Sequence, residues 1–374
     1  MAGCTAEESA PETPEGVRVY VGTGSDDPEA GIYRFRFAPR TGALTPVGSV
    51  TPTMNPTYLT LSEEGRHLYS VNETADSAMV SAFAVDPDTG DLTRLNQVAA
   101  RGGAPCYISM DATGRWVFVA NYLGGNLAVF PVQGDGSLGA ATQVVSHTGS
   151  GADPERQTAP HAHYVHVDPQ NRYVLAADLG IDEIRVYPFD AARGRLDTAA
   201  VRRVETPPGT GPRHLSVHPN GEIVYMIGEL GGTVTAYDYE AETGRMTPRQ
   251  TVRTVPEDFD GAARSADIHV HPSGNFVYAS NRGDANGIVH YRVDDTGTLT
   301  AAGRQREQIE WPRHFAIAPG GEHLLVANRH ADRITVYRIH PGTGALTFTG
   351  QTATVPAPTN ITFAPTAPRP QTEP

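Results

Sequence analysis

Two short motifs and one glutamate carry much of the chemistry of this sequence. The motif PHAH contains His161 and His163, the motif GPRH contains Arg213, and Glu229 follows Arg213 by sixteen residues. Imidazole and carboxylate groups can transfer protons near neutral pH. A guanidinium group is planar and permanently charged, so it suits paired contacts with carboxylate or phosphate. These residue types indicate a site for a small anionic ligand.

Further candidate ligand-binding residues occur at corresponding places later in the chain. They are Arg282, Arg313, His314, Asn328 and Arg329. The formal net charge of the chain is -13. Arginines that gather at one place in such an acidic protein favour an anionic ligand there.

The PHAH motif also raises the question of a metal site. His161 and His163 alternate, so on a β-strand their side chains would point the same way. His-x-His alone is weak evidence for zinc, and no third ligand is spaced nearby. We therefore expect neither a metal nor an organic cofactor. The sequence also lacks a Gly-x-Ser-x-Gly elbow and a Cys–His nucleophile pattern, so covalent catalysis is unsupported.

One phrase is written seven times along the chain and predicts the fold. It reads Pro, an apolar alternation, a Gly-centred turn, a second apolar run, and then Asn or an acid. The copies begin at Pro56, Pro105, Pro160, Pro212, Ser265, Pro312 and Pro358, 46 to 55 residues apart. Two more strand-like runs follow each copy, the last a short Leu or Met strand such as DGSLGAA or ETGRMTPRQ. Four-stranded units repeated radially make a β-propeller.

The two ends of the chain predict how the ring closes. The seventh copy stops near Pro365 after its first strand, whereas VRVYVGTG from Val17 matches a second strand. We predict an all-β, seven-bladed propeller over residues 17–365, whose last blade is completed by the N- and C-terminal strands. An open solenoid would need polar capping repeats, which neither end resembles. Residues 1–16 and 366–374 are expected to be disordered tails.

The repeat also separates candidate site positions from structural ones. In such a blade the first strand lines the channel and the second returns antiparallel, so the start of one and the end of the other share a face. Every candidate residue named above falls at one of these places. Arg213 and Glu229 break the repeat's consensus, which favours a functional role.

Other polar residues of the repeat have structural explanations. Recurrent asparagines at strand ends favour a turn role; they are Asn72, Asn121, Asn281 and Asn328. His166 points to the other side of its strand and is expected in the packed core. His218 and His271 belong to His-Pro turn phrases and are expected to be structural.

Composition and charge exclude several classes of protein. The net charge of -13 argues against a nucleic acid or an anionic membrane surface as partner. No stretch approaches the roughly 18 consecutive apolar residues of a membrane-spanning helix. We expect a soluble domain that is a monomer or a weak homo-oligomer.

The cysteines and the first residues bear on the compartment. Cys4 and Cys106 give neither a disulfide framework nor a metal spacing. Met-Ala-Gly-Cys resembles the end of a bacterial lipoprotein cleavage box, but the basic and apolar regions of a signal peptide are absent. We expect a cytoplasmic protein. Export with a lipid anchor at Cys4, after a truncated signal, is the alternative.

Taken together, these phrases resemble the seven-bladed lactonase propellers, a family that includes one type of bacterial 6-phosphogluconolactonase and the fungal carboxy-muconate cyclases. The resemblance covers residues 17–365 and rests on VYVGTG, NPTYL, GAPCYI, VFVANYLGGNLAVF, PHAHYVHVDP, GPRHLSVHPNG, SNRG and WPRHFAIAPGG. It implies hydrolysis of a small anionic sugar lactone, 6-phosphogluconolactone, to its open acid. That reaction is the second step of the pentose phosphate route.

The resemblance also implies roles for individual residues. The family's site residues match His161 or His163, Arg213, Glu229 and Arg282. We expect His163 or Glu229 to act as base for water and Arg213 to hold the oxyanion or the lactone carbonyl. Phosphate or carboxylate would be held by Arg282, Arg313 and Arg329.

The sequence leaves two alternative functions open. The first is an enzyme with the same rim and another substrate, such as a muconate-type lactone cyclase or a different sugar lactonase. The second is a non-enzymatic binding propeller, and the cluster of His, Arg and Glu on one rim argues against it.

Overall fold

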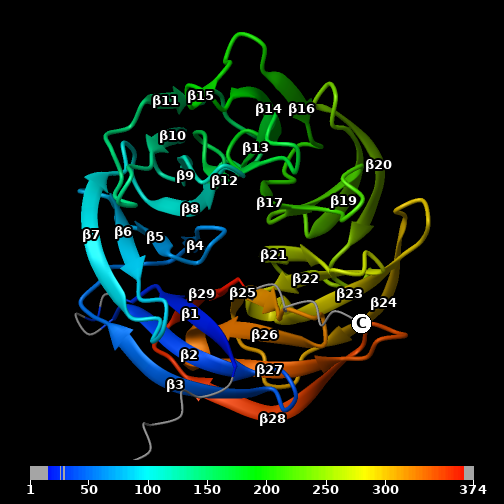
Figure 1. Ribbon diagram of the computed structural model, residues 1–374. Helices are drawn as coiled ribbons and strands as arrows, with labels where there is room; N and C mark the ends of the chain where they lie inside the picture. The colour runs from blue at the N-terminus through cyan, green and yellow to red at the C-terminus, as the bar shows by residue number, and fades with distance from the viewer. Residues whose placement is uncertain (1–15, 26, 28–29, 366–374) are drawn as a thin grey trace, which may run out of the picture.

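Seven antiparallel sheets are arranged as blades around a central axis (Figure 1). The computed structural model describes residues 16–25, 27 and 30–365. In this part the chain forms no α-helix; two short 3-10 turns, η1 (Gly283–Ala285) and η2 (Arg329–Ala331), join strands. The predicted all-β, seven-bladed propeller is confirmed. The predicted tails and Cys4 lie outside the described residues, apart from Gly16.

Each blade runs from an innermost strand to an outer strand, in chain order except in the seventh blade, where the last strand of the chain is innermost. The innermost strands are β4 (Leu59–Leu61), β8 (Pro105–Met110), β12 (Ala162–Val167), β17 (Pro212–Val217), β21 (Ser265–Val270), β25 (Pro312–Ile317) and β29 (Pro358–Phe363). The second strands are β5 (His67–Asn72), β9 (Trp116–Asn121), β13 (Tyr173–Asp178), β18 (Ile223–Gly228), β22 (Phe276–Asn281), β26 (His323–Asn328) and β1 (Val17–Thr23).

The third and outer strands follow in the same order of blades. The third strands are β6 (Met79–Val85), β10 (Asn126–Pro131), β14 (Glu183–Asp190), β19 (Thr233–Glu240), β23 (Gly287–Val293), β27 (Arg333–Ile339) and β2 (Ile32–Ala38). The outer strands are β7 (Leu92–Ala99), β11 (Gln143–Ser146), β15 (Arg195–Leu196) with β16 (Arg202–Glu205), β20 (Arg245–Arg253), β24 (Leu299–Gln305), β28 (Leu346–Thr354) and β3 (Ala43–Val50). We number the blades 1 to 7 in this order.

The burial of the strands explains their composition. Second strands such as β18 and β26 are buried at every residue, because both of their faces pack against neighbouring blades. Outer strands such as β28 alternate between covered and exposed residues. Apolar side chains of adjacent blades meet in the layers between them; the rings of Phe118 in blade 2 and Phe189 in blade 3, for example, pack edge to face with centroids 5.1 Å apart.

The ring closes as the truncated seventh copy predicted. Strand β29 pairs antiparallel with β1, with Ile361 opposite Val21 and Phe363 opposite Val19, and β2 and β3 complete the blade. Figure 1 shows the blue N-terminal strands beside the red β29 in this sheet. Closure pairs the first and last strands of the propeller, so neither is left as an open sheet edge.

A repeated hydrogen bond joins most pairs of adjacent blades. A ring on the second strand donates to a backbone carbonyl in a turn of the following blade at six junctions within the described chain. The pairs are Tyr20–Gly90, Tyr69–Gly136, Trp116–Ala191, Tyr173–Glu242, Tyr225–Gly297 and Tyr278–Gly344. These hydrogen bonds hold the blades, and with them the strand ends at the channel mouth, in fixed positions relative to one another.

The outer strand of blade 2 differs from the prediction. Residues 135–141 (DGSLGAA) form only an isolated bridge between Leu138 and Val132, and β11 lies further on, at Gln143–Ser146. Three glycines fall within residues 134–139, and glycine weakens a strand because it loses more backbone entropy and packs no side chain. Among the described residues, no helix is long and apolar enough to cross a membrane.

Candidate active site at one mouth of the channel

Two rings of equivalent positions meet at one mouth of the channel. The start of each innermost strand lies opposite the end of the second strand; Pro212 pairs with Gly228, for example, and Pro312 with Asn328. This is the shared face that the repeat predicted. The residues just past the second strands form the first ring and are Glu73, Tyr122, Leu179, Glu229, Arg282, Arg329 and Gly24.

The second ring is made by β-bulges. In six blades the pairing of the innermost strand shifts at its mouth end, which leaves one residue, or two in blade 5, out of the ladder. These residues are Cys106, His163, Arg213, Ala266 with Asp267, Arg313 and Thr359. A bulge re-aims a side chain that regular pleating would send into the sheet packing. The site is thus built from one irregularity repeated around the ring.

Glu229 gathers three arginines at this mouth. Its Oε2 lies 2.9 Å from Arg213 Nε and 2.8 Å from Arg282 Nη2, and its Oε1 lies 2.8 Å from Arg156 Nη2. The arginines come from β17, from the residue after β22, and from the segment between β11 and β12. Three guanidinium groups around one carboxylate leave a net charge of +2, which suits an anion.

Arg213 is held at several points and still has donors to offer. Its Nη1 contacts His214 Nε2 at 3.3 Å and donates to the carbonyl of Ala266. Within the part of the chain that the structure describes, no group accepts from Arg213 Nη2. These N–H groups are therefore available to a ligand, and they belong to a side chain that is only 1% exposed.

Burial and mutual repulsion shape the protonation of this cluster. Burial alone would raise the pKa of Glu229, but Arg282, Arg213 and Arg156 outweigh it and hold that pKa well below its usual range. Burial lowers the pKa of Arg213, and Arg313 lowers it further. Burial likewise lowers the pKa of Arg282 to about 9, with Arg213 and Arg313 adding to the shift. Glu229 is ionised, and a bound anion would relieve the crowding of the guanidinium groups.

His163 is a buried, neutral histidine of the mouth. Burial lowers its pKa well below the usual value, and Arg213 and His214 lower it further. Its Nδ1 is buried without a hydrogen-bond partner among the described residues. The ring packs edge-on against Tyr122, with centroids 5.6 Å apart. A neutral imidazole with an unused nitrogen beside Arg213 has the chemistry of a general base.

The position of His161 near His163 does not result from the alternation of side chains along one strand. It precedes β12, stacks on Tyr122 with ring centroids 4.4 Å apart, and its Nδ1 lies 3.0 Å from the Tyr122 carbonyl. The bulge between Ala162 and Tyr164 interrupts the alternation that the prediction assumed. Both rings contact Tyr122, but only His163 is buried.

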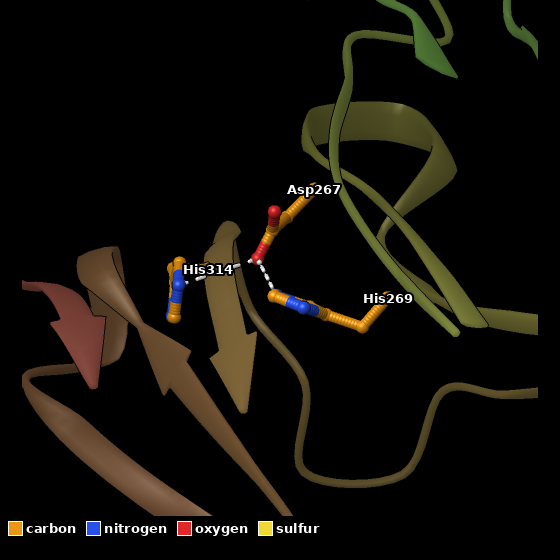
Figure 2. Close-up of side chains that lie close together, drawn as sticks. All are labelled: Asp267, His269 and His314. Atoms are coloured by element: carbon orange, nitrogen blue, oxygen red, sulfur yellow. Dashed lines mark hydrogen bonds and ion pairs between the residues drawn. The ribbon is translucent and has the colours of Figure 1, made fainter. Parts of the chain in front are cut away.

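A layer of rings and one carboxylate lies next to this cluster. Tyr58, Tyr107 and Tyr164 pack in series, with centroids 4.2 and 4.6 Å apart, and the ring of Tyr107 meets that of His214 at 5.1 Å. His214 also packs against His163, with centroids 5.2 Å apart. Asp267 from blade 5 contacts His214, His269 and His314, and Figure 2 shows the last two rings around it.

The remaining predicted ligand residues are divided between the mouth and the frame. Arg313 lies on the mouth, with Nη2 3.5 Å from Glu73 Oε2. Arg329 donates to the carbonyl of Gly24, in blade 7. His314 is buried in the layer with Asp267.

Of the two roles expected of Asn328, structural and ligand-binding, its contacts support the structural one. Its amide nitrogen donates to Val326 and Thr335, and its oxygen accepts from the Glu310 backbone. The side chain is fully buried, so both ends of the amide are used within the frame. The structural role expected for Asn72, Asn121 and Asn281 is supported, because their amide groups also donate to backbone carbonyls.

Of the roles expected for the other histidines, the structure supports two and contradicts one. His218 contacts the Gly274 carbonyl and His271 the Gly321 carbonyl, so their structural role is supported. The expectation that His166 is packed in the core is wrong. Its side chain is exposed, and its position on an innermost strand places that surface toward the channel.

Arg156 and Tyr122 are the residues that sequence reasoning missed. Arg156 lies in the segment between β11 and β12, outside the repeated phrase, so subtraction of the repeats could not select it. Tyr122 stood at a strand end, but no chemistry was assigned to it. It supports both histidines and lies 3.3 Å from Arg156 Nη2 through its hydroxyl. Only their positions in the sequence could have pointed to these two residues: Tyr122 follows Asn121, and Arg156 precedes the PHAH motif by four residues.

The fold and the site together define a closed seven-bladed propeller with a cationic mouth. The chain belongs to the family described as Lactonase, 7-bladed beta-propeller, whose sequence profile matches residues 18–363. The resemblance inferred from the motifs is confirmed.

Relatives and a solved structure agree with this family. The chain is 34% identical to a 6-phosphogluconolactonase of Bacillus subtilis, over 92% of this chain and 97% of the relative. It is 33% identical to a 6-phosphogluconolactonase of Formosa agariphila, over 88% and 94%. The structure of the periplasmic gluconolactonase of Pseudomonas aeruginosa superposes with a TM-score of 0.88 at 34% identity, covering 93% of this chain and 99% of that one.

Proposed function

We propose that this protein hydrolyses the ring ester of 6-phospho-D-glucono-1,5-lactone to give 6-phosphogluconate, the second step of the pentose phosphate route. The observation that carries the proposal is the set of three arginines held by Glu229 beside the neutral His163. The cluster supplies a base and an excess of positive charge in one buried place. Membership of the lactonase family and the names of two relatives support the same reaction.

The proposed mechanism uses side chains of this chain alone. His163 accepts a proton from water, whose oxygen adds to the lactone carbonyl carbon. The Nη2 group of Arg213 donates to the oxyanion that develops on the carbonyl oxygen. The tetrahedral intermediate then collapses, the bond from the carbonyl carbon to the ring oxygen breaks, and protonated His163 returns its proton to that oxygen. One water is consumed, and the product is an open-chain hydroxy acid.

Between the two bases expected from sequence, the contacts favour His163, because its Nδ1 has no hydrogen-bond partner among the described residues, whereas both oxygens of Glu229 already contact guanidinium groups. Glu229 is held ionised by three guanidinium groups, and a carboxylate stabilised in this way is a poor proton acceptor. We therefore assign Glu229 to the orientation of Arg156, Arg213 and Arg282. The phosphate would be held by Arg156, Arg282, Arg313 and Arg329, whose charges suit a dianion.

The direct test compares two freshly prepared substrates, 6-phosphogluconolactone and unphosphorylated gluconolactone, with spontaneous hydrolysis subtracted. We expect a kcat/KM for the phosphorylated lactone at least tenfold above that for the other, and its loss in Arg213→Ala. Equal kcat/KM values on both substrates would show that the protein does not recognise the phosphate. They would favour the activity named for the Pseudomonas relative.

The compartment is part of the same proposal. Sugar phosphates are charged and do not cross membranes unaided, so the proposed phosphorylated substrate supports a cytoplasmic location. The relative whose name places it in the periplasm is called a gluconolactonase, without a phosphate. Cell fractionation with an antibody to the propeller would decide between cytoplasm and export.

A further inference from the structure

The motif Pro-Arg-His occurs twice, at residues 212–214 and 312–314, on the innermost strands of blades 4 and 6. Blade 5 lies between them and contributes Asp267 to both histidines. Its Oδ1 lies 2.8 Å from His214 Nδ1, and its Oδ2 lies 3.6 Å from His314 Nε2. The carboxylate therefore links two equivalent motifs that are a hundred residues apart.

Asp267 is an ionised carboxylate at the centre of a group of donors. Besides the two histidines, His269 Nε2 lies 2.9 Å from Oδ2, and the backbone N–H groups of Ile268 and Phe315 donate to it at 3.0 and 3.2 Å. The side chain is 1% exposed. Burial would raise the pKa of Asp267, but His269, His314 and the bond from His214 hold it well below the usual value.

The protonation of His214 follows from this contact. An ionised carboxylate can only accept, so His214 must carry its proton on Nδ1. Burial lowers the pKa of His214 to about 3, so the ring is neutral and its Nε2 is an acceptor. That Nε2 lies 3.3 Å from Arg213 Nη1. The carboxylate thus determines which nitrogen of His214 faces the arginine.

The same three side chains, Asp267, His269 and His314, could also be considered as a metal site, because one ligand atom of each lies within 4.8 Å of the others (Figure 2). The hydrogen bonds contradict that assignment. Both nitrogens of His314 already have neighbours: Nδ1 lies 3.2 Å from the Ile361 backbone nitrogen, and Nε2 lies 3.2 Å from Asn360 Nδ2. His269 Nε2 must carry a proton to bond Asp267 Oδ2. These atoms are therefore used within the protein, and Arg213 and Arg313 add positive charge nearby, which disfavours a bound cation.

We propose that Asp267 is a positioning residue, which fixes His214 as the Nδ1–H tautomer and through it aims the guanidinium of Arg213 into the mouth. Glu229 forms an ion pair with Arg213 on the Nε side, the Ala266 carbonyl and His214 hold it at Nη1, and Nη2 is left for the ligand. The role of Arg213 at the oxyanion rests on the proposed function. The tautomer and the orientation of Arg213 do not depend on it.

The first test is spectroscopic. Long-range ¹H–¹⁵N correlation of histidine-labelled protein reports the tautomer of each ring, and His214→Gln assigns the signal. We expect the Nδ1–H form for His214 in the wild type and a mixed or Nε2–H signal in Asp267→Asn. An Nε2–H signal in the wild type would overturn the proposal. So would stoichiometric metal in the purified protein by elemental analysis.

The second test is kinetic. We expect Asp267→Asn to lower kcat about 10- to 100-fold, as for other residues that orient a catalytic group, with KM changed less than about twofold. Asp168→Asn is the matched control. Asp168 is equally buried and accepts from the backbone of Arg172 and Tyr173 and from the Tyr239 hydroxyl, in a turn rather than at the mouth. A similar loss of kcat in Asp168→Asn would mean that replacing any buried aspartate lowers the rate, which would contradict a specific role for Asp267.

A double-mutant cycle ties the effect to Arg213. If Asp267 acts through Arg213, adding Asp267→Asn to Arg213→Ala should change kcat/KM less than about twofold. The same loss in both backgrounds would overturn the proposal. Because the tautomer is measured without substrate, an inactive wild type would refute the proposed function, while this inference would still be judged on the spectrum.

Discussion

The Nε of Arg213 lies 2.9 Å from Oε2 of Glu229, although the two residues are sixteen apart in the sequence. The spacing is the length of one hairpin. Arg213 is the bulged residue at the start of β17, and Glu229 follows the end of β18, whose Gly228 pairs with Pro212. The pair is thus a cross-strand contact at the open end of a hairpin, where nothing in the blade requires a charge. Glu229 then gathers the arginines of three separate segments.

Replacement of Glu229 by glutamine tests whether this carboxylate holds the arginines together. The change leaves three guanidinium groups without a buried counter-charge, and loss of one partner from a buried ion pair costs about 3 to 5 kcal/mol. We expect a free energy of unfolding lower by about that amount in urea titrations. We also expect inorganic phosphate to stabilise Glu229→Gln more than the wild type, since the mouth gains one unit of positive charge.

The control for this variant is Glu240→Gln. Glu240 pairs with Arg245 on the exposed surface, where the loss of one partner should change stability by less than about 1 kcal/mol. Equal stability of Glu229→Gln and the wild type would contradict an anchoring role for Glu229.

The sequence predicted the frame of this molecule better than its site, and particular residues show why. Apolar alternation and turn glycines recur in every blade, so the strands, the closure by β29 and the mouth that holds Arg213 could all be read from the repeat. The geometry at His163 could not be read in this way, because a bulge depends on a strand pairing that alternation does not reveal. Side-chain alternation predicted that His161 and His163 lie on the same strand, whereas His161 precedes β12.

Two further failures have different physical causes. Arg156 lies in a segment that occurs in a single blade, so comparison of repeats had nothing to set against it. Asn328 occupied a rim position and was expected to bind ligand, but its amide is used up by the frame. The hydrogen-bonding capacity that remains after folding decides whether a rim residue can act, and this is a property of the three-dimensional structure.

Arg156 offers a test of phosphate recognition. Its side chain is 38% exposed and is oriented by Glu229 and Tyr122, so it can reach a ligand above the buried arginines. A hydrogen bond to a charged group contributes about 1.5 to 3 kcal/mol, or about 10- to 150-fold in affinity. We expect Arg156→Ala to raise KM for 6-phosphogluconolactone about tenfold or more and to change KM for gluconolactone less than twofold. The matched control is Arg193→Ala, which removes an exposed arginine paired with Asp190 in a turn of blade 3. Equal changes on both substrates would show that Arg156 does not contact the phosphate.

His163 predicts the acid side of the pH profile. A general base acts when unprotonated, and burial with the nearby Arg213 lowers the pKa of His163 well below 6.5. The kcat/KM should therefore stay level as the pH falls from 8 through 6.5 and decline only further down. Gluconolactone should be measured in parallel, because the substrate phosphate itself titrates near pH 6. A decline centred at or above pH 6.5 on gluconolactone would exclude His163 as the base. His163→Gln should lower kcat about 10²- to 10⁴-fold, whereas His218→Gln in a turn should not.

The buried histidines around Asp267 predict acid lability of the fold itself. Burial lowers the pKa of His214 to about 3 and that of His314 to about 4, against about 6.5 in an unfolded chain. The unfolded state therefore takes up protons first as the pH drops below 6.5, and each histidine should cost about 1.4 kcal/mol of stability per pH unit down to about pH 4. His269 has a raised pKa, so it is protonated in both states below pH 6.5 and adds no slope there. Urea titrations at pH 7, 6 and 5 should show the free energy of unfolding falling with pH, and His214→Gln should remove the share of one histidine from the slope, about 1.4 kcal/mol per pH unit. A free energy of unfolding that is the same at pH 5 and pH 7 would mean that these rings are not held neutral in the folded protein.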